Sequence, residues 1–114
     1  MKVILMEEST KRNNQITELI QRKKHQVITC TNTNDFMQAL EDSSVDRIVL
    51  NVETWQRGNA IYKYFGIPKG LGAVPVVFYN APENFINITN RDRNENDRVL
   101  TKPVEPEAVV EALE

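Results

Sequence analysis

The stretch DRIVLNV at positions 46–52 decides the fold, because it contains a short, continuous apolar run that ends at Asn51. A run of this kind, rich in β-branched side chains, is typical of a strand that is covered on both faces. Comparable runs are KVILM at 2–6, VITC at 27–30, VPVVFY at 74–79 and RVL at 98–100. The sequence therefore predicts five strands, of which the first and the third form the central pair.

The segments between these runs carry apolar residues at helical spacing. Ile16, Leu19 and Ile20 share one face of a first helix, which we expect to begin after a Ser9-Thr10 capping signal. Further helices are expected after Asn34 as N-cap, over 59–65, as a short or ragged helix within 81–97, and from Pro106 onward. Strands and helices in alternation predict βαβ units around a parallel sheet.

Length and charge bound the class of protein. The 114 residues correspond to one domain, 1–114, and the chain stops inside its last helix, so we expect a domain cut from a longer protein or a short free-standing protein. A net charge of −2 without a basic stripe argues against nucleic-acid binding by this domain. No apolar run approaches the ~20 residues of a membrane span, and a single cysteine, Cys30, fits a reducing compartment. We therefore expect a cytoplasmic domain that makes no membrane contact.

Polar side chains follow the ends of four predicted strands. Glu7 and Glu8 come after the first strand, Asn51 ends the third, Asn80 ends the fourth, and Lys102 comes after the fifth. In an open parallel sheet, ligands bind beyond the carboxyl ends of the strands. The sequence therefore predicts one polar cluster in which two carboxylates, two amides and an ammonium group converge.

This arrangement resembles the receiver domain of two-component response regulators over essentially the whole chain. The matching features are the acidic pair, the residue that ends the third strand, a small polar residue followed by alanine after the fourth, and Lys102-Pro103 after the fifth. The separations Glu8–Asn51, Asn51–Asn80 and Asn80–Lys102 are 43, 29 and 22 residues, close to those of the family. The resemblance implies an α/β fold with three αβα layers around a five-stranded parallel sheet of order 2-1-3-4-5, the flavodoxin-like or CheY-like (βα)5 arrangement.

The same resemblance shows that the phosphate switch of the family is altered here. In the family, an acidic pair holds Mg²⁺, a third-strand aspartate accepts the phosphoryl group, a fourth-strand hydroxyl and a fifth-strand aromatic respond to it, and a lysine pairs with the phosphate. The corresponding positions are Glu7 and Glu8, Asn51, Asn80, Val99, and Lys102. An amide is a poor nucleophile, so Asn51 cannot form an acyl phosphate.

The altered positions also bear on metal binding. Loss of one carboxylate weakens a site for Mg²⁺, so we expect no cofactor, with Glu7 and Glu8 as the remaining metal candidates. The longer glutamate side chains are expected to neutralise Lys102 directly, without a metal.

These departures predict a pseudo-receiver: a phosphorylation-independent protein-interaction module of a bacterial two-component or phosphorelay protein, and not an enzyme. Its expected partners are signalling proteins or its own output domain, with a homodimer through the face of the fourth and fifth strands as a further expectation. The alternative is a ligand- or metal-responsive switch, or a receiver that is phosphorylated at another acceptor such as Glu53.

Several of these residues also have a plainly structural interpretation. Glu7 and Glu8 would then be solvated acids, Asn51 an amide that caps the loop after its strand, and Lys102 an ordinary surface lysine. Elsewhere, His25 is expected to be a solvated residue at a helix end and Cys30 a small buried residue, while Trp55 lies in a loop as either a partner contact or part of the local core.

Overall fold

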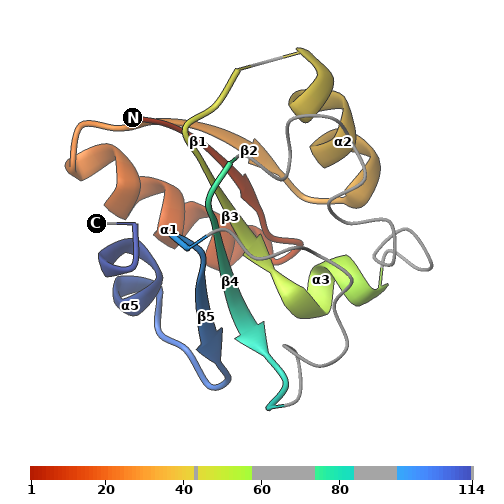
Figure 1. Cartoon of the computed structure of the whole chain (residues 1–114), viewed down its shortest axis with the longest axis vertical. Helices are drawn as coiled ribbons and strands as arrows, with labels where there is room; N and C mark the ends of the chain where they lie inside the picture. Colours follow the sequence, from red (N-terminus) through yellow and green to blue (C-terminus); the bar gives the residue numbers. More distant parts are fainter. Residues whose placement is uncertain (43, 58–73, 84–94, 114) are drawn as a thin grey trace.

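Five parallel strands form one sheet in the order β2-β1-β3-β4-β5, as the sequence predicts (Figure 1). The computed structural model describes residues 1–42, 44–57, 74–83 and 95–113. The strands are β1 (Lys2–Met6), β2 (Gln26–Cys30), β3 (Arg47–Asn51), β4 (Val76–Ala81) and β5 (Arg98–Thr101). β3 lies at the centre of the sheet, between β1 and β4.

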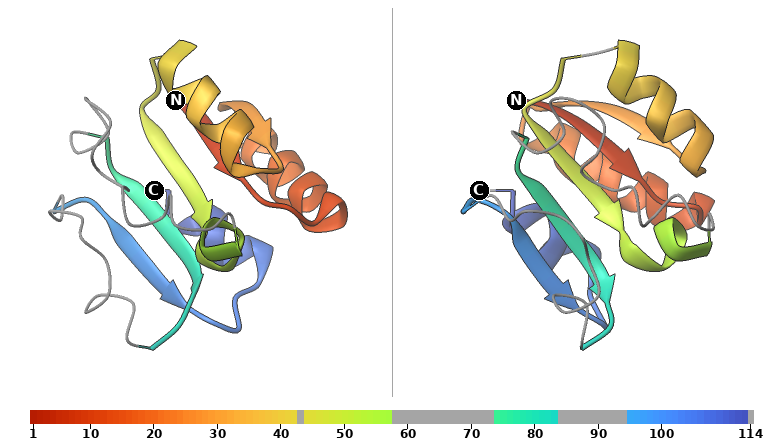
Figure 2. Two further views of the ribbon diagram at one scale, coloured as in Figure 1. Left: turned by 90° about the vertical axis from the view of Figure 1, so that its right-hand side faces the viewer. Right: turned by 45° about the vertical axis from the view of Figure 1, so that its right-hand side comes forward.

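Helices cover both faces of the sheet and give three αβα layers (Figure 2). The described helices are α1 (Thr10–Arg22), α2 (Thr33–Asp42), α3 (Val52–Arg57) and α5 (Pro106–Glu111). α1 and α5 pack side by side on one face, and α2 and α3 lie over the other.

The continuous apolar runs are explained by this double covering. Successive side chains of a strand point to opposite faces, so Val3 and Leu5 of β1 pack toward α1 and α5, while Ile4 and Met6 pack toward α2 and α3. All four side chains are fully buried. Each burial stabilises the fold by about 1.5–3 kcal/mol, so a polar residue at any of these positions would be costly.

The N-termini of α1 and α2 show which residues cap these two helices. Ser9 caps α1, its hydroxyl accepting a hydrogen bond from the Arg12 backbone N–H at 3.3 Å, which confirms the predicted start. The prediction of Asn34 as cap of the second helix was wrong, because α2 begins at Thr33 and Asn32 accepts from the Asp35 N–H at 2.8 Å.

α3 begins directly after β3, which the sequence analysis did not predict. The expectation that Trp55 lies in a loop was wrong: it belongs to α3, is 2% exposed, and packs edge-on against Phe36 with ring centroids 5.4 Å apart. Trp55 is therefore part of the core. The helix expected over 59–65 and most of the segment in which a short or ragged helix was expected, 81–97, lie outside the described residues.

Two further sequence-based expectations concern residues near β2. Cys30 is buried, as predicted, and burial together with the nearby Asp35 carboxylate raises its pKa from 9.0 to about 11. His25 is half-buried and not fully solvated, since its Nδ1 lies 3.0 Å from the amino group of Met1.

In the described part of the chain, no helix has the length and apolar character needed to cross a membrane.

Candidate functional site

The carboxyl ends of β1, β3 and β4 meet at a buried polar network centred on Glu7, which is 1% exposed. Oε1 of Glu7 accepts hydrogen bonds from Asn51 Nδ2 and from the Tyr79 hydroxyl, both at 2.8 Å. Oε2 accepts from the Ser9 backbone N–H at 3.0 Å. Arg12 adds a longer ionic contact, 3.9 Å from Oε1. Both carboxylate oxygens are therefore engaged by protein donors, as a buried charge requires.

Asn51 links this carboxylate to α3 through the two ends of its amide. While Nδ2 donates to Glu7, Oδ1 accepts from the backbone N–H groups of Glu53 at 2.9 Å and Thr54 at 3.3 Å. Oδ1 thereby satisfies two of the N–H groups that the first turn of a helix leaves without a partner. Only this orientation of the amide places a donor toward the carboxylate and an acceptor toward the helix. Asn51 thus has the predicted structural role of a cap, but it caps the helix α3 and not a loop, and its other end also binds Glu7.

Tyr79 is the residue of the network that the sequence analysis missed. Burial raises the pKa of its hydroxyl well above the usual range, and the neighbouring Glu7 carboxylate raises it further. The hydroxyl therefore stays protonated and acts as a donor. Alternation within the apolar run of β4 places Val77 and Tyr79 on one face. The presence of a tyrosine among aliphatic residues was the available signal, because a buried hydroxyl needs a partner.

Asn13 of α1 secures the backbone next to the network. Its Nδ2 donates to the carbonyl of Glu7 at 3.1 Å and to the carbonyl of Cys30 at 3.4 Å. These two carbonyls end β1 and β2, so one buried side chain fixes α1 against both strands. The position of the Glu7 carboxylate is therefore held from the backbone side as well.

Asn80 lies at the rim of this network in an unusual backbone conformation. Its φ of 59° is in the left-handed region, and the pairing of β4 with β5 shifts register between Phe78 and Ala81. Its Nδ2 reaches Asn51 Oδ1 at 3.5 Å, at the limit of a hydrogen bond. β4 continues one residue further, to Ala81, so the predicted strand end at Asn80 was wrong by one position.

Lys102 pairs with Glu53 and not with the acidic pair after β1. Its Nζ lies 2.9 Å from Glu53 Oε1, and the two side chains are 51% and 32% exposed. The prediction that Glu7 or Glu8 neutralises Lys102 was therefore wrong for the described residues. Glu7 turns inward to Asn51 and Tyr79, while Glu53, in the first turn of α3, projects toward the loop after β5.

The two remaining predicted positions lie outside the buried network. Glu8 is exposed, and its backbone N–H approaches the Thr54 hydroxyl at 3.4 Å. Val99 is half-buried in β5 and packs against the core on the α2 and α3 face. Of the six predicted site residues, the structure joins Glu7, Asn51 and Asn80 by hydrogen bonds and places Glu8, Val99 and Lys102 around them.

This set of side chains does not fit Mg²⁺. The ion requires near-octahedral oxygen ligands, whereas both oxygens of Glu7 already accept from protein donors and a donor nitrogen of Asn51 faces the carboxylate. The oxygen of Asn51 is occupied by the α3 backbone. Nor does any group of three or more His, Cys, Asp or Glu residues suited to a metal ion occur among the residues that the structure describes.

Comparison with known proteins places this architecture among receiver domains. CheY4, a chemotaxis response regulator of Vibrio cholerae, superposes with a TM-score of 0.74 at 15% identity, covering 98% of this chain and 94% of that one. A two-component response regulator from Clostridium difficile gives 0.74 at 14% identity, covering 99% and 92%. A receiver-modulated diguanylate cyclase from Pelobacter carbinolicus gives 0.73 at 14% identity, covering 98% and 87%.

These likenesses show the fold, the five-stranded receiver arrangement that the sequence predicts. No protein-family model matches the sequence, and no curated protein matches it either.

Proposed function

We propose that this chain is a receiver-type signalling domain that binds its partners without being phosphorylated and without catalysing a reaction. The observation that carries the proposal is the hydrogen bond from Asn51 Nδ2 to Glu7 Oε1 at 2.8 Å. In a phosphorylatable receiver this pair of positions would present two carboxylates to a metal ion. Here one side chain donates and the other accepts, so the network is complete without metal or phosphate.

The chemistry of Asn51 supports the same conclusion. An amide oxygen carries no charge and is a poor nucleophile, and this one already accepts two backbone hydrogen bonds. Its 2% exposure leaves little access for a phosphodonor. A receiver scaffold of this kind would hold its surface in a single state, to be read by a signalling protein or by an output domain of the same protein.

We place the interaction surface on the face of β4 and β5, where receiver-type domains are expected to engage partners or a second copy. Val99 contributes to the core instead of offering an exposed aromatic ring there. Residues 84–94 lie outside the described residues. Support for this placement is analogy of fold, and a pull-down with variants of exposed β5 residues such as Arg98 tests it.

A second candidate function rests on the ion pair of Lys102. Its ammonium group lies 2.9 Å from Glu53 Oε1, so Glu53 holds the position relative to the lysine that a phosphoacceptor would need. In this alternative a Glu53 oxygen attacks an acyl phosphate and a carboxylate leaves. The partial exposure of Glu53 makes this position accessible, in contrast to Asn51.

Intact mass spectrometry distinguishes the two functions. The chain is incubated with Mg²⁺ and acetyl phosphate, and the fluorescence of Trp55 is followed in the same samples, because α3 begins at the site and carries this residue. We expect no added phosphoryl group and no fluorescence change. A stoichiometric, base-labile adduct would overturn phosphorylation independence. Its loss in Glu53→Gln, with retention in the matched control Glu107→Gln, an exposed glutamate in the first turn of α5, would then assign the acceptor to Glu53.

A further inference from the structure

β2 is an edge strand whose outer side is open among the described residues (Figure 2). On its inner side the Gln26 N–H donates to the carbonyl of Met1, and the carbonyl of Cys30 accepts from the Glu7 N–H, both at 2.9 Å. Gln26, Ile28 and Cys30, which are every second residue of the strand, therefore direct their backbone N–H and C=O groups toward β1.

Val27 and Thr29 direct their backbone N–H and C=O groups to the open side of β2. This follows because the hydrogen-bonding direction alternates from residue to residue along a paired strand, and the register with β1 is regular from Lys2–Gln26 to Met6–Cys30. An edge of this kind is a template for another strand.

β2 lacks the features by which edge strands avoid pairing. Its sequence, QVITC, contains no charged residue, proline or glycine, and no bulge interrupts its pairing with β1. The opposite edge differs in each respect. β5 has four residues, begins at Arg98, lies beside a register shift, and is followed by Lys102 and Pro103. The two edges of the sheet are therefore unequal, and β2 is the one suited to pairing.

We propose that β2 pairs antiparallel with β2 of a second copy of this chain, with a two-fold axis at Ile28. In this register Val27 of one copy lies opposite Thr29 of the other, so the outward backbone groups of both copies meet as hydrogen-bonded pairs. The two five-stranded sheets become one continuous sheet. This interface lies at the far edge from β4 and β5 and is independent of the function proposed above.

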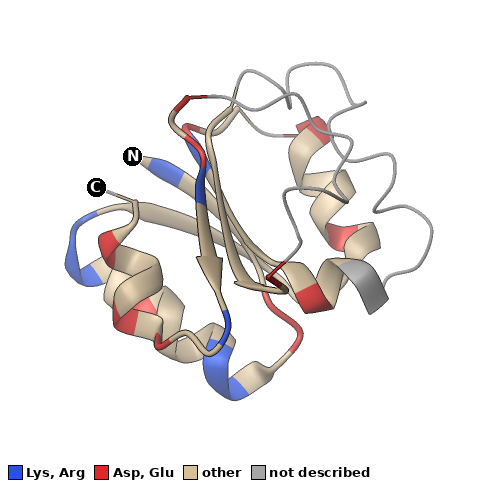
Figure 3. Cartoon of the chain, turned by 60° about the horizontal axis from the view of Figure 1, so that its bottom comes forward, with Lys and Arg blue, Asp and Glu red and all other residues tan. Residues whose placement is uncertain are grey.

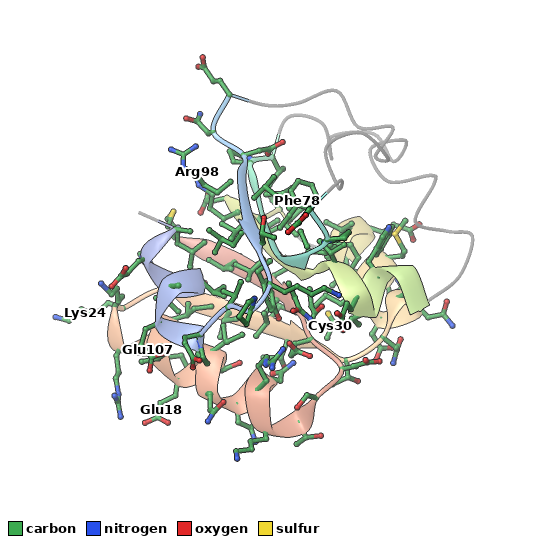
Figure 4. The ribbon with its side chains drawn as sticks, turned by 90° about the horizontal axis from the view of Figure 1, so that it is seen from below. Glu18, Lys24, Cys30, Phe78, Arg98 and Glu107 are labelled. Atoms are coloured by element: carbon green, nitrogen blue, oxygen red, sulfur yellow. The ribbon has the colours of Figure 1, made fainter. Side chains whose placement is uncertain are left out.

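The charges at the two ends of β2 fit this partner. Lys24 lies in the turn before the strand, and Figure 4 shows its side chain pointing away from the molecule, with Cys30 at the other end of β2. Beyond that end, the Asp35 carboxylate accepts a hydrogen bond from the Asn32 side chain at 3.0 Å. Figure 3 shows the basic residues near the start of β2 and the acidic residues of α2 as separate segments.

An antiparallel arrangement brings these opposite charges together twice. With the axis at Ile28, the start of one β2 lies beside the end of the other, so Lys24 of one copy approaches the segment of the other copy in which the Asn32 side chain holds Asp35. A parallel arrangement of the two β2 strands would instead place like charges side by side. Charge complementarity therefore selects both the partner, a second copy, and its direction.

Charge reversal tests the interface. Sedimentation equilibrium is measured up to about 1 mM chain in low salt for the wild type, Lys24→Glu, Asp35→Lys and the double variant. We expect each single variant to raise the dimer dissociation constant at least about tenfold, and the double variant to return to within about threefold of the wild type. A wild type that stays monomeric over the whole range, or a dimer indifferent to both single variants, would overturn the proposal.

Hydrogen exchange locates the interface independently. We expect the amide protons of Val27 and Thr29 to become protected as protein concentration rises, while that of Ile28 stays protected throughout because it faces β1. Dimerisation without concentration-dependent protection at Val27 and Thr29 would place the contact on another face and refute pairing through β2. Neither measurement depends on phosphorylation, so failure here leaves the proposed function untouched.

Discussion

Nδ2 of Asn51 donates to Oε1 of Glu7 at 2.8 Å, so a donor and an acceptor meet where β3 and β1 end. The contact couples the end of β1 to the start of α3, because the oxygen of the same amide accepts from the first turn of that helix. Exchanging the amide for a carboxylate would therefore change electrostatics and packing at once.

The first prediction concerns Asn51→Asp. Two carboxylates would lie in contact where a donor and an acceptor now meet, so we expect the free energy of unfolding to fall by about 2–3 kcal/mol in EDTA. Because carboxylates suit Mg²⁺, part of this loss should be recovered in millimolar Mg²⁺. Urea unfolding with and without the metal measures both effects.

The double variant Glu7→Gln/Asn51→Asp is the matched control for this prediction. It restores a donor opposite an acceptor with the two roles exchanged, so it should be more stable than Asn51→Asp alone. Equal stability of the wild type and Asn51→Asp in EDTA would show that the contact contributes nothing.

A second prediction concerns alkaline pH. The pKa of Tyr79 is raised in the folded state, so its contribution to stability is complete below the unfolded pKa, near 10.0, and is lost as pH rises above it. Cys30 adds a loss between pH 9.0 and about 11. Unfolding free energies measured from pH 7 to 11 should therefore decline in the wild type.

The variants Tyr79→Phe and Cys30→Ala separate the contribution of the tyrosine hydroxyl from that of the cysteine thiol. Tyr79→Phe removes a hydrogen bond to a buried carboxylate, so we expect it to lose about 1.5–3 kcal/mol at neutral pH and to decline less steeply above pH 10. Cys30→Ala should flatten the earlier part of the curve. A Tyr79→Phe variant with the wild-type slope would contradict the assigned cause.

The third prediction uses the backbone of Asn80. Its φ of 59° is accessible to glycine without steric cost and is unfavourable for a β-branched residue. Thermal unfolding should therefore show Asn80→Gly within about 1 kcal/mol of the wild type and Asn80→Thr destabilised by about 1–2 kcal/mol. If Asn80→Thr were as stable as Asn80→Gly, the left-handed conformation would not be required by the fold.

The fourth prediction concerns the pair of Lys102 and Glu53. Both side chains are partly exposed, so solvent and salt screen their attraction, and Lys102→Met should cost less than about 1 kcal/mol. Chemical denaturation at low and high salt measures this difference, which should shrink as salt rises. A loss above 2 kcal/mol would indicate that Lys102 has a further role in the folded state.

Much of the fold could be predicted from the sequence because the signals are local. Each strand is a short apolar run. β1 is buried on both faces, so Val3 to Met6 lack the alternation of polar and apolar residues that marks a sheet with one exposed face. The start of the third helix could not be predicted in the same way. Asn51 ends a strand and caps a helix with one side chain, so no linker separates β3 from α3 to mark the boundary.

The sequence predicted three members of the network, Glu7, Asn51 and Asn80, but it predicted neither Tyr79 nor the hydrogen bonds. Strand ends placed Glu7, Asn51 and Lys102 at one edge of the sheet, as the topology requires. Which carboxylate would meet Lys102 depended on side-chain direction, and Tyr79 decided it by drawing Glu7 inward. That donor came from the end of an apolar run, where a tyrosine indicates that its hydroxyl needs a buried partner but does not identify the partner.

The amide of Asn51, which donates at one end and accepts at the other, also bears on how the proposed function could give way to a phosphate switch. Asparagine and aspartate differ by one atom, yet restoring the acid alone would set it against Glu7 and withdraw the donor that the buried carboxylate relies on. Under the proposed function, Asn51→Asp would therefore depend on a bound cation to offset the repulsion between the two carboxylates. Without metal, the stability of the protein itself would disfavour the single change that introduces the acid.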